Sequence, residues 1–391
     1  MRRGLLAIII VFPLLYRLDA VEIRYKFDPN TALYIETNSI VCRLYENEYI
    51  GDSIYKEVSY IKTENIESDK ATLSINNYVM EDTKLNYKTN TYKTKTDTSY
   101  KFKKDTYGKN YHTETKKGLH SFPFFPQNSV EIGDVWTRPS KYNIDIFNDN
   151  KSALSLDIDV VYRLSAVEII DDEQILTISA NATFIHNKNR AAFLGSGIKK
   201  IVGFSSFLIK FNNTAGRPSV IEEMYDYTYI LDDCELIETS GSSKSVYKVP
   251  PPIKIEETHN WENDEDFKDT EIKIIDGKLY IVMANIHFKP DSPEILYGEH
   301  NRVDKVARLI DNYKFNQIII IGHTADIGQP KNQKTLSEER ALTILNYFVE
   351  KHKFNASYIS YGGKGGENPI ADNSTPEGRA KSRRVEIIVL P

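Results

Sequence analysis

Two stretches decide the fold of the C-terminal third of this chain: QIIIIGHT at residues 317–324 and NPIADNSTPEGRAKSRRVE at residues 368–386. The first contains four consecutive isoleucines, which are typical of a short strand buried on both faces of a sheet. The second begins with turn-forming residues and leads into a last apolar strand, residues 385–390. The sequence therefore predicts a small sheet with a buried central strand and a final strand that follows a long loop.

Two amphipathic helices flank the isoleucine strand. Ser292 is a candidate N-cap for the first helix, with Pro293 at its first helical position. Thr335 and Glu338 form a capping-box pattern for the second helix, with Ser337 as a competing cap. The expected apolar faces consist of Val303, Val306, Ala307 and Ile310 in the first helix, and of Ala341, Ile344, Leu345 and Phe348 in the second.

Two further strands are expected at residues 280–288 and 358–361. The element order is then β-α-β-α-β, followed by a loop and a final β-strand. This order predicts an α/β sandwich with two main helices on a mixed sheet.

Residues 21–248 are expected to be rich in β-strands, so the chain as a whole is predicted to be α+β. The segments 175–180 and 206–211 carry β-branched and aromatic residues with partial alternation. Turn residues at 212–218 predict a hairpin after the second of these segments. The Lys-, Thr- and Tyr-rich segment 84–118 suggests a solvated hairpin, and Trp136 is expected to pack into a β core.

The domain organisation follows from changes in composition along the chain. Arg2, Arg3, a short apolar run and Ala20 are typical of a secretory signal peptide over residues 1–20. Length favours two β-rich parts, residues 21–120 and 121–248. A Pro-rich and acidic linker is expected over residues 249–275, followed by the C-terminal domain over residues 276–391.

Composition and motifs exclude several classes of function. The hydrophobic share of 40% and the charged share of 27% are those of an ordinary folded protein, and a net charge of -5 does not favour nucleic acid. Neither Cys42 nor Cys234 has partners at metal-ligand spacing, and whether the two pair is open. The glycine-rich run 361–366 lacks the ending of a phosphate-binding loop, so a flexible loop is expected. No cofactor or catalytic arrangement is indicated, and His323 is expected to be a packed or loop residue.

The C-terminal motifs resemble those of the OmpA C-terminal family. The resemblance rests on residues 322–324 (GHT), 336–341 (LSEERA) and 368–386, in order and at the spacing of the family, and covers about residues 279–391. It implies a non-catalytic envelope protein of a diderm bacterium that binds peptidoglycan in the periplasm, and it leaves open an association with the outer membrane and with other envelope proteins. It implies nothing about residues 21–248.

The family resemblance also implies a pocket for the diamino acid of the peptidoglycan stem peptide. Arg340 matches the arginine that would take the ligand carboxylate. Ala325 stands where the family has an aspartate for the ligand ammonium, and Asp326 follows one residue later. Gln333 replaces a family asparagine. The candidate binding residues are Thr324, Asp326, Gln333, Arg340 and Arg379.

Two hypotheses follow from the alanine at position 325. In the first, the protein binds peptidoglycan weakly, because one partner of the charge pair is missing. In the second, the domain is a scaffold that has lost wall binding and serves as a structural or protein-interaction module. Arg384 is expected to brace the last strand through Glu386.

Overall fold

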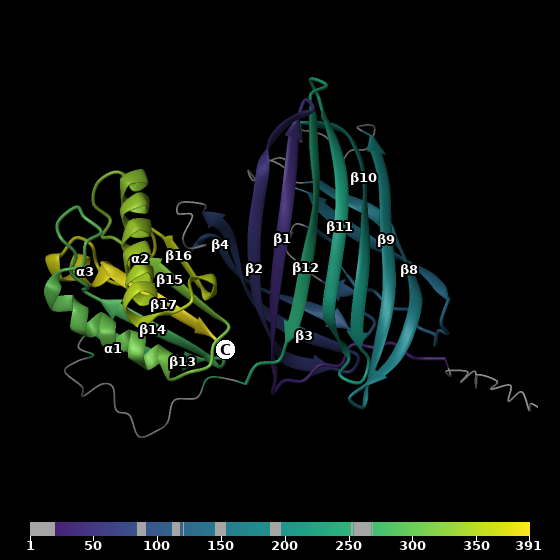
Figure 1. Ribbon diagram of the computed structural model, residues 1–391, viewed down its shortest axis with the longest axis horizontal. Helices are drawn as coiled ribbons and strands as arrows, with labels where there is room; N and C mark the ends of the chain where they lie inside the picture. Colours follow the sequence, from purple (N-terminus) through teal and green to yellow (C-terminus); the bar gives the residue numbers. More distant parts are fainter. Residues whose placement is uncertain are drawn as a thin grey trace, which may run out of the picture.

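A computed structural model describes residues 20–83, 91–111, 118–119, 121–144, 154–187, 197–251, 253, 267 and 269–391. The chain folds as an α+β protein, as the sequence predicts. A large curved antiparallel sheet formed by the N-terminal region stands beside an α/β domain formed by the C-terminal region (Figure 1). The expected signal peptide, residues 1–19 above all, and most of the expected linker lie outside the described residues.

Long strands build the N-terminal sheet. They run in the spatial order β7-β8-β9-β10-β11-β12-β1-β2-β3-β4, with every neighbouring pair antiparallel. Their bounds are β1 Ala32–Tyr45, β2 Glu48–Glu67, β3 Lys70–Thr83, β4 Thr91–Asp105, β7 Val135–Ile144, β8 Leu154–Ile170, β9 Glu173–Asn187, β10 Ile198–Asn212, β11 Arg217–Leu231 and β12 Leu236–Lys248, with the short strands β5 Asn110–Tyr111 and β6 Gly118–Leu119. The predicted hairpin at residues 212–218 is confirmed as the β10–β11 turn.

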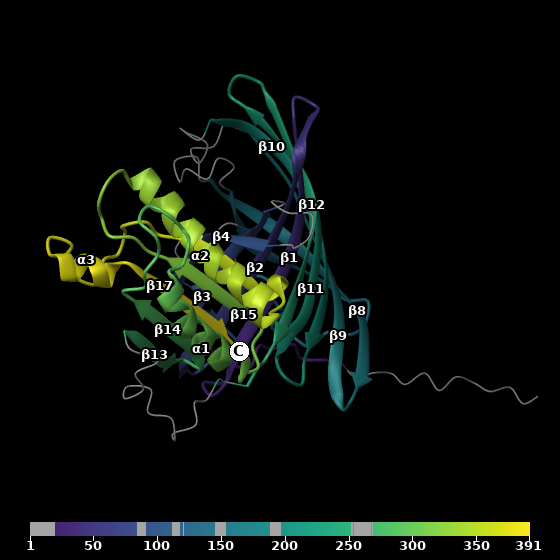
Figure 2. The same ribbon diagram turned by 60° about the vertical axis from the view of Figure 1, so that its left-hand side comes forward.

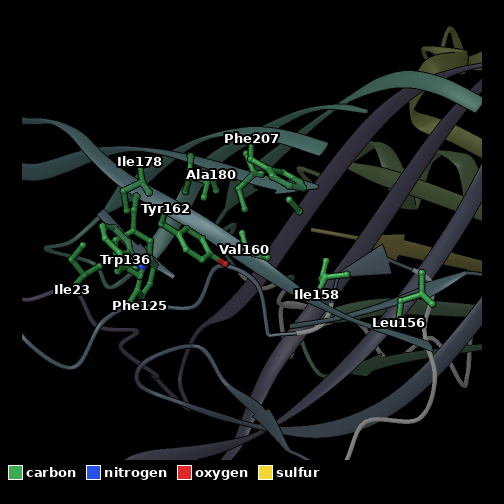
Figure 3. Close-up of a cluster of buried hydrophobic side chains, with 14 of the residues drawn as sticks. Ile23, Phe125, Trp136, Leu156, Ile158, Val160, Tyr162, Ile178, Ala180 and Phe207 are labelled. Atoms are coloured by element: carbon green, nitrogen blue, oxygen red, sulfur yellow. The ribbon is translucent and has the colours of Figure 1, made fainter. Parts of the chain in front are cut away.

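Alternation along the strands creates the main core of this region. In β8, Leu156, Ile158 and Val160 are buried while the residues between them are exposed. Figure 3 shows these side chains in line with Tyr162, which stacks on Trp136 at a ring-centroid distance of 5.5 Å. The indole nitrogen of Trp136 donates to the Phe124 carbonyl over 3.1 Å, so the prediction of a Trp packed into a β core is confirmed.

The C-terminal domain is a five-stranded sheet with helices on one face. Its strands are β13 Thr270–Ile275, β14 Lys278–Ala284, β15 Gln317–Gly322, β16 Ile359–Gly363 and β17 Arg384–Leu390, in the spatial order β13-β14-β17-β15-β16. The helices are α1 His300–Asp311, α2 Pro330–His352 and α3 Pro376–Ser382, with short 3-10 turns at Tyr297–Glu299 and Ala356–Tyr358. The predicted apolar faces of α1 and α2 are buried against the sheet.

Three expectations about the helices were wrong. The first helix begins at His300 instead of Pro293, because the Ser292 hydroxyl accepts from the backbone N–H of Glu294 in a local turn. The second begins at Pro330, five residues before the expected cap, and the Thr335 hydroxyl donates to the Lys331 carbonyl inside the helix. The expected loop before the last strand contains α3, which Thr375 caps by accepting from the Gly378 N–H.

The two regions of the chain share a sheet edge and a core. Strand β4 pairs in parallel with β16, through Ser360 opposite Tyr92 and Tyr361 opposite Lys93. Behind the C-terminal sheet, a mixed apolar cluster joins Tyr34, Val58, Tyr78 and Met80 of the N-terminal region to Ile319, Ile321, Ile388 and Leu390. Both views show the C-terminal domain lying against the β1–β4 part of the large sheet (Figures 1 and 2).

Several boundaries drawn from sequence stay predictions. Strands from both sides of residue 120 belong to one sheet, because β12 pairs with β1. Strand β13 lies within the segment expected as linker and pairs with β14. Strand β4 lies within the segment expected as a solvated hairpin, residues 84–118, and pairs along its whole length with β3, which precedes that segment.

Cys42 and Cys234 are both free thiols. No helix among the described residues is long and apolar enough to cross a membrane.

Candidate functional site

The candidate site lies where the parallel strands β15 and β16 end. Carboxyl ends of parallel strands meet at one edge of a sheet, so the loops that follow them come together there. The Thr324 N–H donates to the Gly365 carbonyl over 2.8 Å, and the Lys364 N–H donates to the Gly322 carbonyl over 3.0 Å. These two bonds join the end of β15 and the loop 323–328 to the loop 364–367.

Helix α2 packs closely on this edge because of two glycines. A Cβ atom at Gly322 would come within 2.1 Å of the Ser337 carbonyl oxygen, and one at Gly363 within 2.1 Å of the Ser337 Oγ. Only glycine fits at such an approach. The run 361–366 is therefore not the flexible loop expected from sequence: Gly362 and Gly363 belong to β16, and the Gly365 N–H donates to the Ser337 hydroxyl over 2.9 Å.

Gln333 in the first turn of α2 ties the two loops to the helix. Its amide nitrogen donates to Asp326 Oδ1 over 3.3 Å and to the Gly328 carbonyl over 3.1 Å. Its amide oxygen accepts from the Gly366 N–H over 3.0 Å. Gln333 thus acts as a brace for the loop that carries Thr324 and Asp326.

Arg340 lies two turns further along α2 and is buried. Its Nε donates to the Ser292 carbonyl over 3.3 Å, and the guanidinium carbon lies 4.8 Å from the centre of the Phe288 ring. Burial lowers the pKa of Arg340, the nearby charge of Arg383 lowers it further, and Asp291 acts in the opposite direction. A guanidinium remains protonated under all such shifts. Within the described part of the chain, Arg340 forms no ion pair with a carboxylate, so its fork can still accept an anion.

Position 325, where the family has an acid to pair with the ligand ammonium, is a buried alanine in this chain. Ala325 is 7% exposed, whereas Asp326 is exposed and engaged by Gln333. The neighbouring Thr324 hydroxyl is buried without a hydrogen-bond partner in the described residues. A polar group in that state can accept or donate a new hydrogen bond.

Two arginines of the last motif, Arg384 and Arg379, have structural partners. Arg384 contacts Glu386 at 2.7 Å and donates to the Asn368 carbonyl over 3.1 Å, which confirms its expected bracing role. Arg379 donates to the carbonyls of Asn373 and Ser374 over 3.0 and 2.9 Å. The Nη1 group of Arg379 therefore holds the loop before α3. His323 is buried at the end of β15 with its Nε2 3.4 Å from Glu386 Oε1, as expected of a packed histidine.

The structure thus brings some expected site residues together and separates others. Thr324, Asp326 and Gln333 share one bonded loop cluster, while Arg340 is held by the segment that contains Phe288 and Ser292. Sequence reasoning missed Phe288 and Ser292, because nothing in their spacing ties the end of a strand to a helix 50 residues away. Ser292 was instead assigned to a helix cap.

Comparison with known proteins agrees with the motif analysis. Residues 287–383 match the model of the OmpA family. Over 102 residues the chain is 40% identical to outer membrane protein A of Bordetella avium, covering 26% of this chain and 48% of that protein. Over 104 residues it is 35% identical to the peptidoglycan-binding protein ArfA of Mycobacterium tuberculosis, covering 27% of this chain and 32% of that protein.

A solved structure of an outer membrane protein from Borrelia burgdorferi is 31% identical, with a TM-score of 0.27, and the match covers 31% of this chain and 97% of that one. The C-terminal region of the chain, residues 287–383, is an OmpA-family domain. The chain spans less than half the length of these two curated relatives.

Proposed function

We propose that the protein is a non-catalytic envelope protein that associates with peptidoglycan through its OmpA-family domain, in the periplasm and close to the outer membrane. The observation that carries the proposal is Arg340: a buried guanidinium, fixed by Ser292 and Phe288, whose other donors no carboxylate in the described residues occupies. The names of the relatives support it, since one is a peptidoglycan-binding protein and another an outer membrane protein.

The proposed ligand is the free end of the diamino acid in the stem peptide, which carries a carboxylate beside an ammonium. A guanidinium fork suits the carboxylate, and the free Thr324 hydroxyl lies in the loop that follows β15. The ammonium would find no acid at position 325. Losing one partner of a desolvated charge pair costs about 2–5 kcal/mol, which is roughly thirty- to several-thousand-fold in affinity. The proposed association is therefore weak.

Sedimentation of the full mature chain with insoluble peptidoglycan tests this proposal. Arg340→Ala should abolish the bound fraction because it removes the carboxylate partner. Arg308→Ala is the matched control, since Arg308 is an exposed arginine on α1. Equal sedimentation of the Arg340 variant and the control variant would refute the proposed site.

A second candidate function is an OmpA-like scaffold without wall binding, which serves as a structural or interaction module for other envelope proteins. The observation in its favour is that Asp326, the one acid near the family position, is exposed and bonded to Gln333. Ala325→Asp discriminates between the two functions. Under the first, it should strengthen sedimentation by about tenfold or more, whereas the uncharged isostere Ala325→Asn should not. Under the second, neither variant changes sedimentation.

A further inference from the structure

The N-terminal region contains a cavity that the proposed wall binding does not use. Its volume is about 410 Å³, within the range of roughly 300–1,000 Å³ typical of small-molecule pockets. Apolar side chains from several strands and from the segment after β6 line it: Ile35, Ile61, Leu73, Phe102, Phe122 and Tyr247. The cavity is thus an apolar space at the inner face of β1 to β4.

One charged side chain reaches this apolar space from β4. Alternation along that strand places Tyr100, Phe102 and Lys104 on the inner face, where Phe102 pairs with the buried Leu73 of β3. Lys103 points the other way and forms a 3.0 Å ion pair with Glu67. Lys104 therefore lines the cavity, whereas its sequence neighbour faces solvent.

Lys104 has no counter-ion among the described residues. Its ammonium lies over the Tyr25 ring, 4.0 Å from the centroid. The adjacent Asp105 is fully engaged elsewhere: one carboxylate oxygen accepts from the N–H groups of Tyr107, Gly108 and Lys109, and the other from the Tyr111 hydroxyl. Burial lowers the pKa of Lys104 to about 7, with the Asp105 charge acting in the opposite direction.

The rest of the lining adds positive charge. Lys26 and Arg217 border the cavity, against a single acid, Asp28. The Lys26 ammonium donates to the Thr214 carbonyl over 2.8 Å, so it is anchored at the β10–β11 turn. Cationic side chains therefore outnumber acidic ones around a wall that is mostly aliphatic and aromatic, with Thr31, Thr63 and Asn110 as its neutral polar residues.

We propose that this cavity binds an anionic single-chain amphiphile: one acyl chain that ends in a carboxylate or a phosphate. The chain would occupy the space between Ile61, Leu73 and Phe102, and the anionic head would meet Lys104. An unpaired buried charge is costly, and an anionic head relieves that cost. The small volume favours one chain over a two-chain lipid.

Displacement of a fluorescent fatty acid, dansyl-aminoundecanoic acid, from the full mature chain tests this inference. Oleate and oleoyl lysophosphatidate serve as the two anionic competitors, and oleyl alcohol serves as the neutral one. The site should bind the probe and release it to at least one anionic competitor at concentrations about tenfold lower than to the alcohol. The better anion identifies the head group. Equal potency of all three competitors, or no probe binding, would overturn the inference.

Two variants locate the site and guard against misfolding. Lys104→Met keeps the volume and the apolar stem, so it should remove the preference for anions while the alcohol still competes. Lys103→Met, on the outer face of the same strand, should behave as the wild type. Ile61→Trp fills the cavity and should weaken all competitors. Thermal melting shows whether Lys104→Met is folded at the assay temperature. If it is not, Lys104→Gln takes its place. Retained anion preference in whichever Lys104 variant folds would refute the assignment.

Discussion

Each of the two regions of this protein holds a cation without a carboxylate partner among the described residues: Arg340 is buried and Lys104 is half-buried. Arg340 in the C-terminal domain is fixed by a hydrogen bond to Ser292 and by the Phe288 ring. Lys104 in the N-terminal sheet lies over the Tyr25 ring and lines a cavity of about 410 Å³. A fixed planar fork suits a small zwitterionic head group, whereas a flexible ammonium beside apolar space suits an amphiphile.

The cations also respond differently to burial. Burial lowers the pKa of both, but a guanidinium keeps its proton throughout the physiological range. Lys104, with a pKa lowered to about 7, loses its charge as the pH rises through neutrality. The comparison teaches that burial leaves the guanidinium site permanently charged and makes the ammonium site sensitive to pH.

The largest expected effect comes from weakening the apolar cluster that the two regions share. Met80 is fully buried in the mixed cluster and contacts Gln317 of β15. Met80→Ala should lower the free energy of unfolding by about 2–5 kcal/mol, because it leaves a cavity between the two sheets. Urea denaturation of the full chain measures this change.

Met224→Ala is the matched control for that substitution. Met224 is 63% exposed, so the same change there should alter stability by less than about 0.5 kcal/mol. Equal effects at the two methionines would mean that the shared cluster contributes nothing, and that the two regions should be compared as independent units.

A second prediction contrasts the two cations by pH. Below pH 7 Lys104 is protonated and anion binding is strong; above pH 7 the cation is lost and binding weakens. Affinity for the anionic competitor should fall by about tenfold between pH 6 and pH 8.5, in line with the loss of one charge contact. The fraction of protein that sediments with peptidoglycan should stay constant over that range, because Arg340 keeps its proton. A flat profile for the anion, measured by probe displacement, would contradict the role of Lys104.

The smallest expected effect concerns Asp326. It is exposed and contacts Gln333, so Asp326→Ala should change wall binding by less than about threefold, equivalent to well under 1 kcal/mol. Asp311→Ala at the exposed end of α1 provides the control. Complete loss of sedimentation in the Asp326 variant would show that this acid has replaced the missing partner at position 325.

Local signals in the sequence were sufficient for much of the C-terminal domain. Four isoleucines marked β15, and the apolar spacing in α1 and α2 identified their buried faces. The predicted first residues of the two helices were wrong, because a serine or threonine side chain can form a hydrogen bond within a turn or inside a helix as well as cap a helix. The contact between Arg340 and Ser292 could not be predicted, because the two residues are 48 positions apart in the sequence.

The N-terminal region shows what sequence patterns could not predict. Alternation correctly predicted strands, yet the pairing of β1 with β12 joins residues about 200 positions apart. Such pairing depends on the whole sheet rather than on any local segment. The environment of Lys104 follows from this pairing: in the sequence it is one of several lysines in a polar stretch, and only the fold separates it from Lys103.

The most direct test of the account is a double-mutant cycle that combines Ala325→Asp with Arg340→Ala, with sedimentation on insoluble peptidoglycan as the readout. If both positions contact the same diamino acid, Ala325→Asp should strengthen binding by about tenfold or more in the presence of Arg340 and should not restore binding in its absence. Such a coupling is the result that the account predicts. Equal effects of Ala325→Asp with and without Arg340, or no effect in either background, would contradict it.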